Sequence, residues 1–138
     1  MTEKTSIELH SKSTFLSTKL FVPRSGSKQV KRTSLIDKLN AFGEYKMTLV
    51  SAPAGFGKTT IICQWIAQLE NQVSWLSLDD KDNDPYIFLQ YLILAIQSVD
   101  SSLGQSASHS LQTAKKQSLT SILIPLLNDI SSSQNQLC

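Results

Sequence analysis

The chain has 138 residues, 41% of them hydrophobic, and a formal net charge of +2. That length suits one domain of ordinary size, and the hydrophobic content allows a buried core. The nearly neutral charge gives no argument of its own for nucleic-acid binding. Cys63 and Cys138 stand far apart, as do His10 and His109, so neither a disulfide framework nor a metal-binding spacing is predicted.

Residues 1–30 are expected to form a lead-in and linker. Residues 1–14 are polar, residues 16–23 form an extended stretch that contains a proline, and residues 24–29 are rich in turn-forming residues. The first charged residues are not followed by an apolar stretch, so no signal peptide is predicted. The apolar runs are too short to span a bilayer. We therefore expect a cytoplasmic protein without a membrane partner.

The remaining residues, 31–138, show alternating helical and strand patterns. Apolar residues recur at helical spacing in residues 33–42, 58–70, 85–99 and 118–130. Two short apolar runs, residues 47–51 and 73–78, fit strands. Residues 100–116 are rich in Ser and Gln, which indicates a loop with a weak helical piece. Strands that alternate with helices predict an α/β fold with a parallel sheet.

Individual residues support several of these helix boundaries. Thr33 or Ser34 can cap the first helix. Asp84 can cap the third helix, with Pro85 at its first position, where proline is favoured. Pro125 inside the last helix predicts a kink.

The segment between the first predicted strand and the second predicted helix carries the clearest chemical signal. Its residues are Ala52, Pro53, Ala54, Gly55, Phe56, Gly57, Lys58, Thr59 and Thr60. In the phosphate-binding pattern G-x-x-x-x-G-K-[ST], Gly57, Lys58 and Thr59 fit the last positions, while Ala52 replaces the first glycine. We call residues 52–60 the glycine loop and predict that it binds the phosphates of ATP or GTP.

Each residue type in the glycine loop suits that task. Gly55 and Gly57 allow backbone N–H groups to turn inward around an anion. Lys58 can reach the β- and γ-phosphates, and the Thr59 hydroxyl can ligate Mg²⁺, which prefers hard oxygen donors. The helix that opens here adds its positive N-terminal end.

Nucleotide hydrolysis would also require a carboxylate that holds Mg²⁺ at the end of a strand. Asp79 and Asp80 follow the second predicted strand and allow two interpretations. They could end a Walker B strand, or they could begin a capping turn before the next helix. The acidic and amide residues that follow them favour the capping turn, and no catalytic residue is predicted.

Four stretches together resemble the N-terminal nucleotide-binding part of the large ATP-dependent LuxR-type transcriptional regulators, the MalT-like group of STAND ATPases. They are residues 18–23, residues 30–39, the glycine loop with Gln64 and Trp65 behind it, and residues 78–92. The resemblance implies a P-loop NTPase fold, that is, a three-layer parallel sheet with flanking helices. It also implies ATP with Mg²⁺ as cofactors and places Val30 and Arg32 near the adenine end of the nucleotide.

The resemblance further implies self-association of the full-length regulator and DNA binding through a C-terminal helix-turn-helix domain. The family's Walker B strand would follow residues 118–130, so the chain is expected to be truncated before that strand and to have an incomplete sheet. We therefore expect residues 31–138 to be an ATP-binding switch module that lacks the sensor and DNA-binding regions. Two alternatives stay open: a compact P-loop kinase or NTPase that uses Asp79 or Asp80 for Mg²⁺, and a non-enzymatic interaction remnant.

Overall fold

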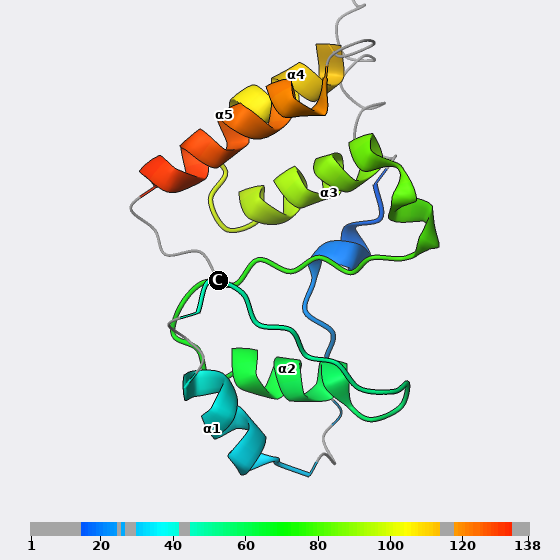
Figure 1. Cartoon of the computed structure of the whole chain (residues 1–138), viewed down its shortest axis with the longest axis vertical. Helices are drawn as coiled ribbons and strands as arrows, with labels where there is room; N and C mark the ends of the chain where they lie inside the picture. Colours follow the sequence, from blue (N-terminus) through cyan, green and yellow to red (C-terminus); the bar gives the residue numbers. More distant parts are fainter. Residues whose placement is uncertain (1–14, 25, 27–29, 42–44, 114–117, 134–138) are drawn as a thin grey trace, which may run out of the picture. The chain divides into compact units, whose positions relative to one another are not determined.

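The structure of the chain is a computed structural model that describes residues 15–24, 26, 30–41, 45–113 and 118–133. The chain forms two compact units (Figure 1). Unit 1 comprises Met1–Phe21 together with Val73–Cys138, and unit 2 comprises Val22–Gln72. Unit 2 is therefore one continuous segment, whereas unit 1 combines two segments, one before and one after unit 2 in the sequence. The division of the sequence at residue 30 stays a prediction.

Unit 1 contains two short 3-10 helices and a group of α-helices. The elements are η1 (Ser17–Leu20), η2 (Asp80–Asn83), α3 (Pro85–Gln97), α4 (Gln105–Thr113) and α5 (Leu119–Ser132). Helices α4 and α5 lie side by side and both pack against α3 (Figure 1).

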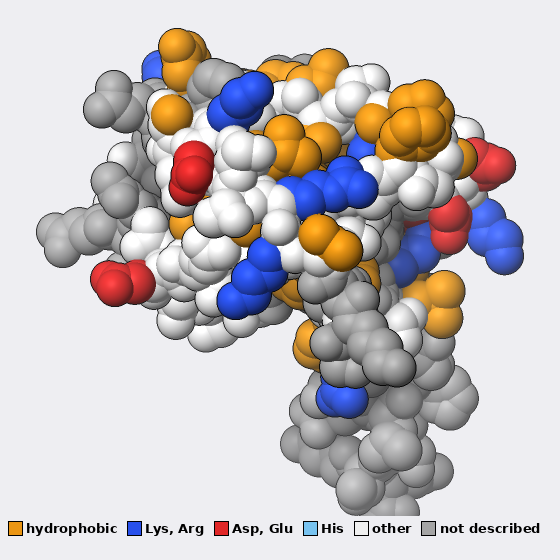
Figure 2. Space-filling model, turned by 90° about the horizontal axis from the view of Figure 1, so that it is seen from below, with side chains coloured by type: hydrophobic (Ala, Val, Ile, Leu, Met, Phe, Trp, Pro, Cys, Tyr) orange, Lys and Arg blue, Asp and Glu red, His pale blue; other side chains and the backbone are white. Residues whose placement is uncertain are grey.

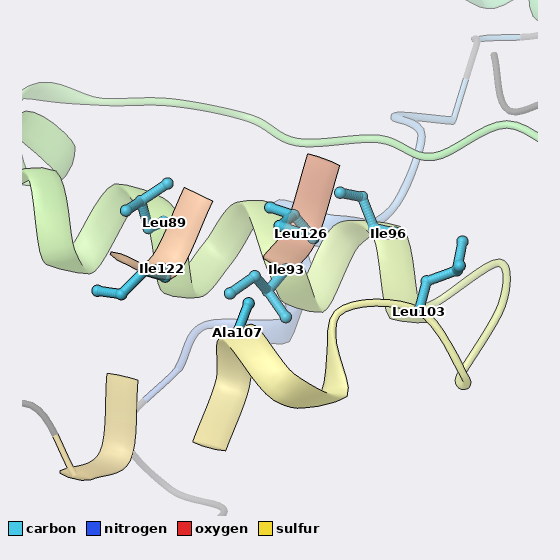
Figure 3. Close-up of a cluster of buried hydrophobic side chains, with 7 residues drawn as sticks. All are labelled: Leu89, Ile93, Ile96, Leu103, Ala107, Ile122 and Leu126. Carbon is cyan, nitrogen blue, oxygen red and sulfur yellow. The ribbon is translucent and has the colours of Figure 1, made fainter. Parts of the chain in front are cut away.

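The core of unit 1 lies between α3, α4 and α5. In Figure 3 the labelled side chains of these helices gather in one cluster with Leu103 from the turn before α4. The members of the cluster are Leu89, Ile93, Ile96, Leu103, Ala107, Ile122 and Leu126. Ile122 is fully buried, and Ile93 and Leu126 are each 2% exposed. Burial of one such side chain contributes about 1.5–3 kcal/mol to folding, so this cluster accounts for the association of the helices.

Unit 2 contains α1 (Thr33–Ala41) and α2 (Lys58–Ile66), which pack on one another. Its core is smaller than that of unit 1 and consists of Ile36, Leu39 and Ile61. Half-buried Val50, Ile62 and Trp65 pack around these three. This core attaches the helix that begins at the glycine loop to the helix that precedes the loop in sequence.

The predicted α/β fold with a three-layer parallel sheet is wrong. The described residues form helices, turns and stretches without regular secondary structure, and none of them belongs to a β-strand. Residues 47–51 and 73–78, for which strands are predicted, have no regular secondary structure and no ladder partner among the described residues. Met47 and Leu49 are 81% and 80% exposed, so this apolar run is not buried.

The two predicted strands are absent from the described residues because a strand requires a pairing partner. An extended chain becomes a strand only when a second backbone pairs with it in register. Ser77 donates a main-chain hydrogen bond to the Lys19 carbonyl oxygen (2.8 Å), but Lys19 belongs to 3-10 helix η1 and not to a strand. Apolar composition predicts burial and cannot by itself supply a pairing partner.

Three of the predicted helices are confirmed. Helix α1 matches residues 33–42 up to Ala41, beyond which the chain lies outside the described residues. Helix α3 begins at Pro85, and the Asp84 carboxylate accepts from the N–H groups of Tyr86 and Ile87, as predicted for its cap. Helix α5 matches residues 118–130, with Pro125 in its interior.

Other elements differ from the prediction. Helix α2 ends at Ile66 instead of continuing to Glu70, and turn-type bonds from Gln68 and Leu69 follow it. Residues 100–116, predicted as mostly loop, contain the regular helix α4. Its Ala107 is fully buried against the core, which stabilises a helix that its Ser- and Gln-rich sequence favours only weakly. None of the helices in the described part of the chain has the length and apolar character needed to cross a bilayer.

Candidate functional site

The glycine loop has the backbone geometry that its two glycines were expected to provide. Gly55 has φ 82° and Gly57 has φ 79°, both in the left-handed region that side chains disfavour. Gly57 is also the N-cap residue of α2 and makes no side-chain cap hydrogen bond. The N–H groups in the first turn of a helix have no intrahelical acceptor. The N–H groups at the start of α2 are therefore not occupied by a side-chain cap and can bind an anion.

Lys58 lies at the first position of α2 and reaches back over the loop. Its Nζ donates to the carbonyl oxygens of Ala52 (2.5 Å) and Pro53 (2.9 Å), which are the first two residues of the loop. The side chain is half-buried. An ammonium group has three donor hydrogens, so Lys58 can keep a carbonyl contact while it binds a phosphate oxygen.

The structure brings Arg32 and Val30 to the glycine loop and α2. Arg32 Nη1 donates to the Phe56 carbonyl oxygen (3.3 Å), in the middle of the loop. Gln64 Nε2, on α2, donates to the Val30 carbonyl oxygen (3.3 Å), and the Val30 side chain is 80% exposed. The two regions that the resemblance assigned to one site are therefore neighbours in unit 2, although they are far apart in sequence.

A further polar contact joins the two helices of unit 2. Trp65 Nε1 donates to Asn40 Oδ1 (2.8 Å), near the end of α1. Neither Gln64 nor Trp65 was predicted as a site residue, because an amide or an indole on an amphipathic helix carries no signal of its own. Their contacts become visible only when α1 and α2 are packed together.

The glycine loop also provides a chemically suitable setting for nucleotide phosphates and Mg²⁺. A Cβ atom added at Gly55 would have no neighbouring atom within 4 Å, so there is space for a side chain. Glycine is favoured at this position because the backbone is left-handed. Thr59, in the first turn of α2, is exposed and offers a hard hydroxyl oxygen, which Mg²⁺ accepts as a ligand. Among the described residues no group of three or more His, Cys, Asp and Glu could hold a metal ion, so a cation here would depend on phosphate oxygens as further ligands.

Asp79 begins a capping turn, which confirms the interpretation favoured from the sequence. Its carboxylate accepts from the Lys81 N–H (2.9 Å), while the Asp82 carboxylate accepts from the Asp79 N–H (2.8 Å), so the two form a capping box around η2. Asp80 is exposed, and its carbonyl oxygen accepts from Asn83 Nδ2. The structure therefore gives no support to Asp79 as the carboxylate of a hydrolytic magnesium site.

The structure also contains a cluster around buried Lys19 that sequence reasoning missed; Asp79 is its exposed member. Lys19 Nζ lies 2.6 Å from Asp82 Oδ2 and 3.0 Å from Asp79 Oδ2, and 4.9 Å from the ring centroid of Tyr91. We call these four residues the lysine cluster. The hydrogen bond to Asp82, and secondarily Asp79, raises the pKa of Lys19 although burial opposes it. The Lys81 N–H and then Lys19 lower the pKa of Asp79.

The lysine cluster holds the N-terminal segment of unit 1 in place. The Leu16 N–H donates to the Tyr91 hydroxyl (3.1 Å), and Phe15 packs edge-on against the same ring. In the sequence Lys19 does not differ from the other basic residues near the N-terminus. Its partners Asp79 and Asp82 follow 60 and 63 residues later, and no spacing rule predicts a contact over such a separation.

Comparison with known proteins identifies relatives for most of the chain. No family model matches it. The chain is 39% identical over 104 residues to the HTH-type transcriptional regulator MalT of Cronobacter sakazakii, and 36% identical over 108 residues to that of Klebsiella pneumoniae subsp. pneumoniae. It is 47% identical over 66 residues to MalT of Yersinia enterocolitica.

These matches cover 74%, 78% and 48% of the chain but only 11%, 12% and 7% of the respective relatives. The chain therefore spans about a tenth of the length of the relatives it matches. Over most of its own length the chain is similar to a segment of the MalT transcriptional regulators. This similarity supports a relationship to MalT-like regulators.

Proposed function

We propose that the chain is an ATP-binding switch module of a MalT-type transcriptional regulator. The observation that carries this proposal is the glycine loop, in which two left-handed glycines lead into a helix that begins with Lys58. Two features of the site favour a polyphosphate there: the N–H groups at a helix N-terminus and the ammonium group of Lys58. The relatives' description as transcriptional regulators supplies the wider role.

In this proposal the glycine loop, residues 52–60, binds the phosphates of ATP. Lys58 contacts the terminal phosphates, and Thr59 supplies its hydroxyl to Mg²⁺, which neutralises phosphate charge when it is bound. Val30 and Arg32 complete the site on the side of α1. The proposal is limited to binding, because Asp79 is used in a helix cap and in an ion pair with Lys19.

The partners of the whole regulator also belong to the proposal. The relatives are named as HTH-type regulators, so we propose that DNA is bound by a part of such a protein outside the segment matched here. We also propose that nucleotide binding is coupled to self-association of that larger protein.

Titration with a fluorescent ATP analogue in the presence of Mg²⁺ tests the proposed binding. We expect Lys58→Ala to raise the Kd at least about tenfold, because it removes a charge-assisted contact to phosphate. Lys38→Ala is the matched control, since Lys38 is an exposed lysine of α1 in the same unit, and it should leave the Kd unchanged. Equal Kd values for wild type and Lys58→Ala, or no binding by either, would contradict the proposal.

A further inference from the structure

Arg32 contacts the main chain of the glycine loop at the peptide group between Phe56 and Gly57. Arg32 Nη1 donates to the Phe56 carbonyl oxygen, and Nη2 lies 4.0 Å from the place where a Cβ on Gly57 would be. The guanidinium group therefore lies alongside the peptide that joins Phe56 to Gly57.

That peptide is trans, as are all the described peptide bonds. In a planar trans peptide the C=O and N–H bonds point in opposite directions. A carbonyl held toward Arg32 therefore turns the Gly57 N–H away from Arg32. Gly57 is the N-cap residue of α2, and the N–H groups at a helix N-terminus can bind an anion.

The rest of the loop has few contacts that could hold this orientation. Phe56 N–H makes a long hydrogen bond to the Pro53 carbonyl oxygen (3.4 Å). Lys58 holds the carbonyl oxygens of Ala52 and Pro53, at the other end of the loop. The Gly57 carbonyl oxygen accepts from the Ile61 N–H (3.0 Å), on the far side of Gly57 from the Phe56–Gly57 peptide. Because glycine places few steric limits on the rotation of its adjoining peptides, the contact from Arg32 can fix the orientation of the Phe56–Gly57 peptide.

Arg32 is itself held in place from α2. Gln64 binds the carbonyl oxygen of Val30, two residues before Arg32, and the core around Ile36 and Ile61 holds the helix that follows. The segment that carries Arg32 is thus attached to α2 on both sides of the arginine.

We infer that Arg32 is a positioning residue that acts on the phosphates through the Phe56–Gly57 peptide, with Gln64 supporting it through Val30. This inference rests on the proposed nucleotide binding and specifies how Arg32 takes part in it. It differs from a direct contact between Arg32 and the base or ribose, because a residue that orients the loop must affect every ligand with the same phosphates. Inorganic tripolyphosphate, which has neither base nor ribose, separates the two roles.

The test measures displacement of a fluorescent ATP analogue by unlabelled ATP and by inorganic tripolyphosphate, each with Mg²⁺. We expect Arg32→Ala to weaken the binding of both ligands by the same factor, about fivefold, as for loss of one hydrogen bond of ordinary strength at an exposed site. Gln64→Met removes the amide and keeps the side-chain length, and it should weaken both ligands equally but by less. Lys31→Ala removes the neighbouring charge, and Gln68→Met changes an exposed glutamine just beyond α2; both should change either Kd by less than about twofold.

A loss of ATP affinity with unchanged tripolyphosphate affinity in Arg32→Ala would overturn the inference in favour of a contact to the base or ribose. Unchanged affinity for both ligands would also overturn it, as would an equal effect of Lys31→Ala, which would make the effect one of net charge. Emission from Trp65 in a Trp75→Phe background checks that unit 2 stays folded in each variant, since Trp65 packs against its core. If wild type binds neither ligand, the proposed function fails before this inference is reached.

Discussion

At the scale of single residues, Lys19 shows how one side chain ties together distant parts of unit 1. It is 8% exposed and contacts carboxylates more than 55 residues later in the chain, at Asp79 and Asp82. A buried cation is tolerated only when paired and hydrogen-bonded, and the lysine cluster provides both. The cluster holds together the two chain segments that flank unit 2 in sequence.

The lysine cluster predicts how stability depends on pH. The pKa of Asp79 is lowered in the folded state, so its contribution is present above its ordinary pKa of 3.8 and is lost as the pH falls through the folded value. The pKa of Lys19 is raised, so its contribution is present below 10.5 and is lost as the pH rises through the folded value. Between these limits the cluster should stabilise unit 1 fully.

Thermal melts of Asp79→Asn against wild type across the acid range check this prediction. Asparagine keeps the cap but loses the charge, so the difference in Tm should be largest near neutral pH and shrink below pH 3.8. Asp80→Asn, next in sequence and exposed, is the matched control and should follow the wild-type curve. A constant difference in Tm for Asp79→Asn would show that the charge of Asp79 does not contribute.

Gly104 is a second position where one residue type is required. Its φ is +68°, and a Cβ there would lie 3.0 Å from Leu126 Cδ1 and 3.2 Å from Ile93 Cγ2. We expect Gly104→Ala to lower the free energy of unfolding by about 2–4 kcal/mol, from left-handed strain and overpacking together. Gly26→Ala is the control, because a Cβ at Gly26 meets nothing within 4 Å. Urea titration followed by circular dichroism compares the two, and equal effects would contradict the packing argument.

At the scale of secondary-structure elements, helices α3 and α5 begin where a side chain caps the first turn. Helix α3 has the clearest start, since Asp84 accepts from the N–H groups of Tyr86 (2.8 Å) and Ile87 (3.1 Å) and Pro85 occupies the first position. Helix α5 starts in the same manner, with Ser118 accepting from the Ser121 N–H. Such signals are local, which explains why these starts were predictable.

The cap of α3 can be tested directly. We expect Asp84→Ala to lower the free energy of unfolding by about 1 kcal/mol, whereas Asp84→Asn should lose much less, because asparagine caps almost as well as aspartate. Chemical denaturation of the two variants gives the comparison. A similar loss in both would mean that the charge of Asp84, and not its hydrogen bonds, stabilises the helix start.

The two stretches predicted as strands show where local signals were not sufficient. Residues 47–51 and 73–78 have the composition of strands, but strand pairing is a property of two segments and not of one. Several of their side chains reach the surface, among them Met47, Leu49 and Leu78. In Figure 2 hydrophobic side chains appear on the surface in separate patches with Lys and Arg side chains between them.

At the scale of the whole molecule, the two units have separate cores. The core of unit 1 joins seven buried residues from Leu89 to Leu126, while that of unit 2 joins three, Ile36, Leu39 and Ile61. Because buried apolar area is the main source of stability, the unit with the larger core is expected to be the more stable of the two.

Each unit contains one tryptophan, which makes this expectation measurable. Trp65 lies in unit 2 and Trp75 in unit 1. In urea titrations of Trp75→Phe and Trp65→Phe, the remaining tryptophan should report a lower midpoint for unit 2 than for unit 1. Ile122→Ala truncates a fully buried side chain of unit 1 and should lower its free energy of unfolding by about 2–5 kcal/mol. The midpoint reported by Trp75 should therefore fall, while the midpoint reported by Trp65 should stay unchanged. Coincident transitions that shift together would show a single cooperative unit.

The sequence by itself determined the features that depend on neighbouring residues. These are the helices α1, α3 and α5, the cap at Asp84, and the left-handed glycines that lead into α2 at Lys58. Tertiary structure decided the rest: the absence of a sheet among the described residues, the lysine cluster, and the contact of Arg32 with the Phe56 carbonyl oxygen. Caps and turns involve groups a few residues apart, whereas a buried ion pair or a strand ladder requires two distant segments to meet, and composition does not specify that meeting.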